Sequence, residues 1–304
     1  MLDPPSITIL GLGAWGKTLY GLLEQQGYPV VGWRRSQGNL ATVASAKLIV
    51  AALPIKAVRA VAEQVAALNP SPDTILLSAT KGLEPGTTQT AADIWQSLLP
   101  QLRVVVLSGP NISVEIEQGL PAATVVGGDE SAAAEVQQIL GSPAFRVYTN
   151  PDRRGVELGG ILKNVMAIAC GANDGLKLGV NSRAALITRG LVEMIRVGTH
   201  WGGQVATFYG LSGLGDLLAT CTSPLSRNYQ VGWHLAQGKS LEQVLDELVG
   251  TAEGVNTAKV LYAYAQDKQL AVPITQEVYA VILGQHSPTQ AIANLLERPF
   301  KPEL

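Results

Sequence analysis

The chain has 304 residues, of which 47% are hydrophobic, and it carries 22 basic and 24 acidic side chains. This length and apolar content allow a large core in two domains and exclude a disordered chain. The net charge of −2 excludes a general attraction to nucleic acid or anionic membranes, so we expect small-molecule partners.

The cysteines and the N-terminal sequence both indicate the cellular compartment in which the protein is expected. Cys170 and Cys221 are far apart in apolar surroundings, which predicts reduced core thiols, and with only three His no metal site is expected. No stretch near residue 1 has the pattern of a signal peptide, and we expect the apolar runs to be too short or too interrupted to cross a bilayer. The sequence therefore predicts a soluble, cytoplasmic protein without membrane insertion.

In the first 150 residues, short β-branched runs alternate with helical patterns, which predicts a mostly parallel sheet covered by helices. The runs at 48–52 and 104–107 are apolar throughout, as is typical of strands buried on both faces. The expected strands are 7–10, 30–33, 48–52, 74–78, 104–107, 123–126 and 145–148.

After residue 150 the strand pattern gives way to helical periodicity over 155–201, 227–237, 240–249, 254–268 and 273–284. Ser226 and Ser240 are predicted N-caps, Gly238 lies just past a helix end, and Pro273 lies at a helix start. We therefore expect an α/β domain at 1–150 and an all-helical domain at 151–304.

A glycine-rich turn, Gly11-Leu12-Gly13-Ala14-Trp15-Gly16, follows the first expected strand directly. In a dinucleotide site Gly11 permits the tight turn, Gly13 lets the backbone approach the pyrophosphate, and Gly16 lets the helix pack closely on the strand. The alternative is an ordinary glycine-rich βα turn. The position between a strand and an amphipathic helix favours dinucleotide binding.

The end of the second expected strand indicates which dinucleotide is bound. NAD-selective sites place an acidic residue there, whereas this chain has Arg34, Arg35 and Ser36, and no acidic residue occurs between Glu24 and Glu63. Arginine pairs well with a phosphate, so we expect NADP(H) to be favoured, with NAD(H) also accepted. A solvated arginine pair at a strand end is the alternative.

Polar runs follow two further strands at the expected carboxyl edge of the sheet, where ligands of open α/β folds bind. They are Thr80-Lys81-Gly82 and Ser108-Gly109-Pro110-Asn111, for which a surface lysine and a plain turn are the alternatives. Lys163 lies in a helix that is otherwise apolar on nearly every side. Burial favours a neutral amine, which suits acid/base chemistry, although a structural lysine that reaches solvent is the alternative.

A last polar cluster lies farther along the helical half. Asp216 and Thr220 are four residues apart and therefore share a helical face. Ser226, Arg227 and Asn228 open the next helix, where side-chain donors and exposed amides suit a phosphate dianion. Simple capping by Ser226 is compatible with this interpretation.

Taken together, these motifs resemble the bacterial-type NAD(P)-dependent glycerol-3-phosphate dehydrogenases over essentially the whole chain. The resemblance implies reversible reduction of dihydroxyacetone phosphate to sn-glycerol 3-phosphate for phospholipid synthesis. It also implies a Rossmann domain joined to a helical domain like that of 6-phosphogluconate dehydrogenase, and it makes a homodimer plausible. The motifs are 11–16, 80–82, 108–110, 119–122, 163–165 with Ala169, 213–216, 226–228 and 252–254.

The resemblance also assigns roles to single residues. Lys163 matches the family's proton-transfer lysine, and we expect Lys81 and Asp216 to assist it by binding substrate oxygens and by orienting the amine. Candidate substrate-binding residues are Lys81, Gly109, Asn111, Lys163, Asp216, Ser226, Arg227 and Asn228. Candidate cofactor-binding residues are Gly11, Gly13, Ala14, Trp15, Gly16, Arg34, Arg35, Lys81, Ser113, Arg227 and Glu253.

The chain departs from the family pattern at a few places. Ala14 replaces a usual Ser, Asn111 a usual Ser or Thr, and Ser113 a usual Ala, and the stretch between Ser36 and the third strand is shorter than usual. Two other functions stay open: a related β-hydroxyacid or 6-phosphogluconate-type dehydrogenase, and a sensor that binds NADPH without catalysis. The phosphate-binding cluster argues against the first, and the two lysines with Asp216 argue against the second.

Overall fold

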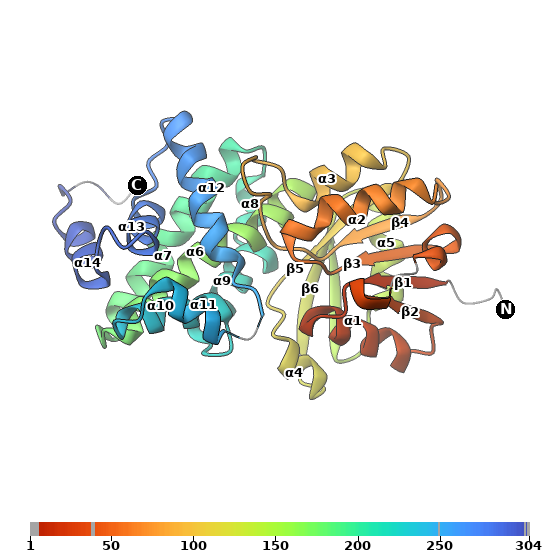
Figure 1. Ribbon diagram of the computed structural model, residues 1–304, viewed down its shortest axis with the longest axis horizontal. Helices are drawn as coiled ribbons and strands as arrows, with labels where there is room; N and C mark the ends of the chain where they lie inside the picture. Colours follow the sequence, from red (N-terminus) through yellow and green to blue (C-terminus); the bar gives the residue numbers. More distant parts are fainter. Residues whose placement is uncertain (1–5, 38–39, 249, 301, 303–304) are drawn as a thin grey trace. The chain divides into compact units, whose positions relative to one another are not determined.

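A computed structural model describes residues 6–37, 40–248, 250–300 and 302, coloured along the sequence in Figure 1. The chain folds into two compact units. The first contains the chain up to Ile161 together with Gly198–Asp216, and the second contains Leu162–Val197 together with the chain from Leu217 onward.

A seven-stranded sheet forms the centre of the first unit, in the order β2-β1-β3-β4-β5-β6-β7. Only β5 and β6 pair antiparallel, so the predicted mostly parallel sheet is confirmed. Each strand lies within two residues of its predicted position. The strands are β1 Ile7–Leu10, β2 Val30–Trp33, β3 Leu48–Ala51, β4 Ile75–Ser78, β5 Arg103–Ser108, β6 Ala122–Gly127 and β7 Phe145–Asn150.

Helices cover both faces of this sheet (Figure 1). Along β3, Ile49 belongs to an apolar cluster that includes residues of α2 (Ile55–Ala67) and α3 (Ala91–Leu98), whereas Val50 belongs to a second cluster that includes residues of α1 (Ala14–Gln25), α4 (Ser113–Glu117) and α5 (Glu130–Leu140). Successive strand residues point to opposite faces, so a strand covered on both sides must be apolar at every position. All four residues of β3 are buried, as its continuous apolar run predicts.

Strand β1 lies where the strand order reverses, because its neighbours are β2 on one side and β3 on the other. In open α/β sheets the carboxyl ends of strands at such a point form the ligand-binding crevice. Only two short 3₁₀ turns, Arg35–Gln37 and Ala41–Ser45, occupy the described part of the connection from β2 to β3. The shortened segment that the sequence indicated therefore has no additional strand among its described residues.

The chain is helical after Asn150, and its described residues contain no further strand, as predicted. Ser226 caps a helix by accepting a hydrogen bond from the Tyr229 amide, and Ser240 forms a capping box with Gln243. The helices are α6 Arg153–Gly175, α7 Gly179–His200, α8 Val205–Phe208, α9 Asp216–Thr222, α10 Arg227–Ala236, α11 Leu241–Glu247, α12 Glu253–Asp267, α13 Pro273–Ile282 and α14 Pro288–Leu296.

Two details of the helical half differ from prediction. The single helical segment expected over 155–201 is two helices, because the chain turns at Leu176–Leu178, where Lys177 adopts φ +56°. Helix α14 was not predicted, although its start has a recognisable signal: Ser287 accepts from the Gln290 amide, and Pro288 is the first helical residue.

The compact units do not follow the boundary expected between residues 150 and 151. That boundary coincides with the end of β7, whereas 151–161 and 198–216 belong to the sheet-containing unit. The division into a dinucleotide-binding domain at 1–150 and a substrate domain at 151–304 stays a prediction.

Helix α6 corrects the expectation that every apolar run is too short or interrupted to span a bilayer. It has 23 residues, and the mean hydropathy of its most apolar window is 1.2. By length and composition it could cross a bilayer, and among the helices that the structure describes it is alone in this. The expectation failed because an otherwise apolar helix of this length tolerates an occasional charge. Its most apolar window is 89% buried inside the protein, as in the core helix of a soluble protein.

A buried carboxyl group connects α6 to the start of α3. Glu157 Oε1 accepts a hydrogen bond of 2.8 Å from the Ala92 amide. Beside it, Arg154 forms a bidentate ion pair with Asp93 at 2.7 and 2.8 Å. Burial of Glu157 disfavours the ionised carboxylate and raises the pKa of Glu157 to about 7.

We therefore expect Glu157→Gln to change how stability depends on pH. Because the folded pKa of Glu157 lies above its unfolded value, the carboxyl stabilises the fold at low pH, and this contribution is lost as pH rises through about 7. Relative to the parent, the variant should gain on the order of 2 kcal/mol in unfolding free energy between pH 5 and pH 8. Urea unfolding across this range measures it, with the exposed Glu63→Gln as control. Parallel stability curves for Glu157→Gln and the parent would contradict the assignment.

Candidate functional site

The glycine turn after β1 is shaped by two close backbone approaches. Gly11 adopts φ +97°, and a Cβ placed there would lie 2.5 Å from the Ala52 carbonyl oxygen beyond β3. A Cβ at Gly16 would lie 1.8 Å from the Gly11 carbonyl oxygen. Both positions therefore require glycine, and Gly16 brings the first turn of α1 directly onto the turn that precedes it.

The start of α1 is open to a ligand. Gly13 is the N-cap residue, no side chain caps the helix, and Gly13 and Ala14 are both exposed. The first turn has no acidic residue, so its amide groups and the positive end of the helix dipole are available to an anion. Trp15 is half-buried and packs against the core below the turn. These features fit a dinucleotide pyrophosphate.

Two glycines of α1 provide a matched test of this turn. Gly16→Ala should weaken NADPH binding and lower unfolding free energy by roughly 1–3 kcal/mol, because its Cβ collides with backbone. Gly21→Ala has no atom within 4 Å of the new Cβ, so it should bind normally and gain up to about 1 kcal/mol. Fluorescence titration and thermal unfolding measure both effects. Equal behaviour of the two variants would show that the close contact is unimportant.

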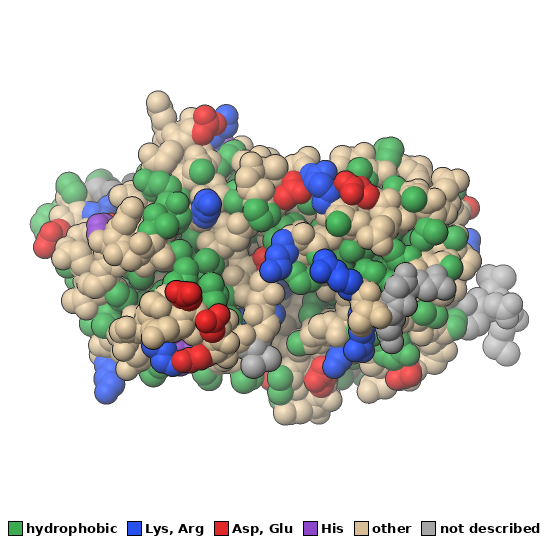
Figure 2. All heavy atoms as spheres, in the orientation of Figure 1, with side chains coloured by type: hydrophobic (Ala, Val, Ile, Leu, Met, Phe, Trp, Pro, Cys, Tyr) green, Lys and Arg blue, Asp and Glu red, His purple; other side chains and the backbone are tan. Residues whose placement is uncertain are grey.

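Arg34 and Arg35 lie immediately beyond β2, next to this turn. The Gly11 amide donates to the Trp33 carbonyl oxygen at 2.9 Å, which extends the pairing of β1 and β2 to the residue before Arg34. Both guanidinium-bearing residues and Ser36 are exposed. On the face drawn in Figure 2, basic and acidic side chains are interspersed, and neither sign covers a continuous area. Arg34 and Arg35 place two positive charges on exposed side chains at this edge of the sheet.

The structure brings together three predicted site residues at the carboxyl edge of β4 and β5. Lys81 Nζ lies 2.6 Å from Asp216 Oδ2 and 3.1 Å from the Gly109 carbonyl oxygen. The Asp216 side chain is 3% exposed and that of Lys81 is 20% exposed. The neighbouring Thr80 hydroxyl donates to the Leu53 carbonyl oxygen at 2.9 Å, which holds the segment against β3. Lys81 is thus a fixed, partly accessible cation.

Asn111 and Ser113 lie on the connection from β5 to β6. Asn111 Oδ1 is 3.0 Å from the Thr124 hydroxyl, and that hydroxyl is 2.9 Å from the Ser108 carbonyl oxygen. Asn111 therefore helps hold its own loop against β6. Ser113 is the first residue of α4 and is half-buried.

Lys163 is buried in α6, as the apolar pattern of that helix predicts, with 7% of the residue exposed. Its Nζ donates a hydrogen bond of 2.6 Å to the Thr220 hydroxyl of α9. Thr220 lies one turn beyond Asp216 in the same helix, so α9 supplies an acceptor to each of the two predicted lysines. The sequence indicated the shared face of Asp216 and Thr220 but not these two pairings.

The residue after Lys163 begins a chain of hydrogen bonds through three helices. Asn228 Nδ2 donates to Asn164 Oδ1 at 2.9 Å, and Asn228 Oδ1 accepts from the Gly254 amide at 2.9 Å. Asn228 is 8% exposed, and Glu253 precedes Gly254 as the first residue of α12. The structure thus links the predicted residue Asn228 to α6 and to the Gly254 amide, which directly follows the predicted residue Glu253. Sequence reasoning assigned no role to Asn164, although an amide inside an apolar run was its signal.

Ser226 and Arg227 open α10 beside this chain. The Ser226 hydroxyl accepts from the Tyr229 amide at 3.3 Å, so the capping interpretation is confirmed. Arg227 is exposed, and Gly250, with φ +102°, lies so close that a Cβ there would be 2.7 Å from Arg227 Nη1. The guanidinium and the first amides of α10 form a candidate phosphate site.

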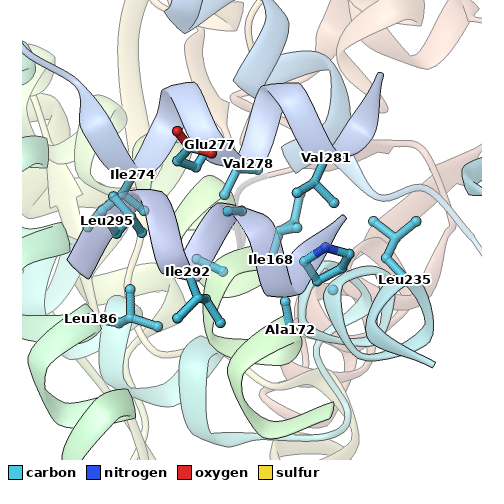
Figure 3. A pocket seen from close by; sticks show the side chains of 14 residues that line it. Ile168, Ala172, Leu186, Leu235, Ile274, Glu277, Val278, Val281, Ile292 and Leu295 are labelled. Atoms are coloured by element: carbon cyan, nitrogen blue, oxygen red, sulfur yellow. The ribbon is translucent and has the colours of Figure 1, made fainter. Parts of the chain in front are cut away.

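A small apolar cavity of about 40 Å³ lies apart from these residues, among α6, α7, α10, α13 and α14 (Figure 3). Its polar lining residue is Glu277, whose carboxylate lies 2.8 Å from His286 Nδ1. None of the predicted site residues lines it. Cys170 and Cys221 are buried free thiols, as expected. Within the described ranges, no group of three His, Cys, Asp or Glu is placed to hold a metal ion.

The open helix start at the switch point of a doubly covered, mostly parallel sheet, followed by a helical half with the buried Lys163, defines a Rossmann-type dehydrogenase architecture. Residues 37–134 match the model of the NAD-dependent glycerol-3-phosphate dehydrogenase N-terminus, and residues 152–293 match that of its C-terminus. The chain belongs to this family of NAD(P)-dependent oxidoreductases. The glycine turn precedes the matched N-terminal range, so its role rests on its geometry.

Relatives agree with this assignment over the full length. The chain is 67% identical over 302 residues to the glycerol-3-phosphate dehydrogenase [NAD(P)+] of Thermosynechococcus vestitus, covering 99% of this chain and 98% of that protein. It is 56% identical over 305 residues to that of a Nostoc species, covering 99% of each. A crystal structure of glycerol-3-phosphate dehydrogenase from Coxiella burnetii matches 97% of this chain and all of that one, at 32% identity and a TM-score of 0.91.

Proposed function

We propose that this protein catalyses the reversible, NAD(P)H-dependent reduction of dihydroxyacetone phosphate to sn-glycerol 3-phosphate. The relatives bear the name of this activity, and the observation that carries the proposal is the buried Lys163 held at 2.6 Å from Thr220. The product would feed glycerophospholipid synthesis in the cytoplasm, and the enzyme would act as a homodimer.

The dinucleotide would be held by the turn of Gly11, Gly13, Ala14, Trp15 and Gly16. The amides at the start of α1 bind the pyrophosphate, and Arg34 and Arg35 bind the 2′-phosphate of NADP(H), which is thereby favoured over NAD(H). Ser113, Arg227 and Glu253 complete the cofactor contacts, together with Lys81. When bound, the reduced nicotinamide supplies a hydride to the carbonyl carbon of the substrate.

Lys163 is the proposed proton donor to the carbonyl oxygen during reduction, and its neutral amine accepts that proton during oxidation. The Thr220 hydroxyl accepts a hydrogen bond from Nζ and so fixes the direction of the amine. Lys81 binds substrate oxygens and stabilises developing negative charge. Asp216 holds Lys81 in place through the pair at 2.6 Å, in addition to the orienting role toward Lys163 that the sequence suggests.

The phosphate of the substrate would be anchored by Ser226, Arg227 and Asn228, and the Gly109–Asn111 loop would lie against the substrate. Arg227 supplies charge and the first amides of α10 supply directed donors. Holding the phosphate fixes the reacting carbon, and such positioning can lower a barrier by several kcal/mol. The direct test is to mix the protein with dihydroxyacetone phosphate and follow NADPH absorbance. Binding of NADPH without its oxidation would refute the proposed reaction.

Replacing Lys163 separates chemistry from binding. Lys163→Ala should lower kcat by roughly 10²- to 10⁴-fold, because the proton donor is lost, and leave the NADPH dissociation constant nearly unchanged. Lys259→Ala, an exposed lysine on α12, is the matched control and should keep full activity. Steady-state kinetics and fluorescence titration measure the two quantities. A variant of Lys163 that lost NADPH binding instead would mark the lysine as structural.

The cofactor preference depends on two arginines. Replacing Arg34 and Arg35 by Ser should lower the ratio of kcat/KM for NADPH to that for NADH by roughly 10- to 100-fold, the equivalent of about one charge-assisted hydrogen bond to the 2′-phosphate, because both side chains are exposed and share that contact with water. Arg146→Ser, at an exposed position of β7, controls for the loss of positive charge. An unchanged ratio in the double variant would rule out their contact with the 2′-phosphate.

A further inference from the structure

Helix α10 carries the proposed phosphate-binding residues, and it is seated on α6 by unusually close backbone contacts. A Cβ at Gly171 of α6 would lie 2.0 Å from the Tyr229 carbonyl oxygen of α10. In return, a Cβ at Gly232 of α10 would lie 1.9 Å from the Ile168 carbonyl oxygen of α6. The two helix backbones therefore touch, and a side chain at either glycine would force them apart.

Close backbone contact sets the spacing of two helices, but polar side chains must set their register. The Tyr229 hydroxyl donates to Asp174 Oδ2 at 2.7 Å, and Arg183 of α7 donates to the same oxygen at 2.7 Å. Asp174 Oδ1 accepts from Asn173 Nδ2 at 3.0 Å. A carboxylate near the end of α6 thus joins α10 and α7 through one atom.

The charge states of this group suit a fixed contact. Burial and the hydrogen bond to Asp174 raise the pKa of Tyr229, so its hydroxyl stays protonated and serves as a donor. Burial acts to raise the pKa of Asp174, but hydrogen bonds from Tyr229, Asn173 and Arg183 outweigh it, and the pKa of Asp174 is lowered. The acceptor is therefore ionised across the neutral range, and its hydrogen bonds are charge-assisted.

Tyr229 directly follows Arg227 and Asn228 in the first turn of α10. Asn228 meets Asn164 at one end of the contact, and Tyr229 meets Asp174 farther along α6. These two hydrogen bonds fix both the rotation of α10 and its displacement along α6. They therefore also fix where the phosphate-binding residues lie along the α6 axis relative to Lys163, which is next to Asn164.

We propose that Asp174 and the Tyr229 hydroxyl are positioning residues that hold α10 in the register on α6 at which Arg227 and Asn228 receive the phosphate of the substrate. This inference rests on the proposed function. Asp174 lies eleven residues after Lys163 on the same helix, a separation of roughly 16 Å, so it acts through α10 and not on the reacting atoms.

Tyr229→Phe tests this by removing one hydroxyl from a packed ring. Measured at saturating NADPH, the KM for dihydroxyacetone phosphate should rise roughly three- to tenfold, since a small misplacement of a binding group weakens its contact, while kcat stays within about twofold. Unphosphorylated dihydroxyacetone has no group for α10 to bind. Its kcat/KM, measured at high enzyme concentration, should be the same for parent and variant.

Tyr262→Phe is the matched control, because Tyr262 lies in α12 and its ring packs at a tilt against Tyr279 with ring centroids 4.9 Å apart. It should leave all of these constants unchanged. Asp174→Ala, alone and combined with Tyr229→Phe, completes a double-mutant cycle in which the two effects on KM should be strongly non-additive.

Three outcomes would overturn the inference: an unchanged KM in Tyr229→Phe, equal losses of kcat/KM with both substrates, or the same rise in KM for Tyr262→Phe. The single variant decides the matter even if Asp174→Ala fails to fold. These outcomes differ from a failure of the proposed function itself. In that case the parent protein would not oxidise NADPH in the presence of dihydroxyacetone phosphate.

Discussion

Much of this structure depends on giving each lysine side chain that is withdrawn from water a hydrogen-bond partner inside the protein. An unpaired buried charge costs several kcal/mol, which is a large part of the stability of an ordinary domain. Lys163 is 7% exposed and bonds to Thr220, and the partly exposed Lys81 bonds to Asp216. The two acceptors are one turn apart on α9. Asp216 and Thr220 on α9 therefore each supply an acceptor to one lysine side chain.

A second constraint recurs at the two places where we expect phosphate groups to bind. The start of α1 is brought onto its strand by Gly11 and Gly16, and α10 is brought onto α6 by Gly171 and Gly232. In each case glycine lets backbone meet backbone. A helix N-terminus binds an anion only if its amides point at a fixed place, so the close contact and the proposed binding function are connected.

The sequence predicted most of the fold because the relevant signals are local. Short β-branched runs identified all seven strands, and Ser226, Ser240 and Pro273 marked helix starts where the structure has them. The errors also have local causes. The turn at Lys177 has no proline and uses a residue that rarely adopts positive φ, and α14 follows a serine-proline signal that is easily taken for a loop.

By itself the sequence determined the succession of strands and helices along the chain, the glycine turn, the arginine pair after β2, and the burial of Lys163. These follow from side-chain periodicity and from the conformational limits of single residues, which act over a few positions. Only the tertiary structure decided that Lys81 pairs with Asp216, 135 residues away, and that Lys163 pairs with Thr220, 57 residues away. It also decided that Asn228 joins Asn164 to Gly254 and that Tyr229 meets Asp174. Such pairings depend on how helices pack and rotate against one another, and no short-range pattern of residues encodes that rotation.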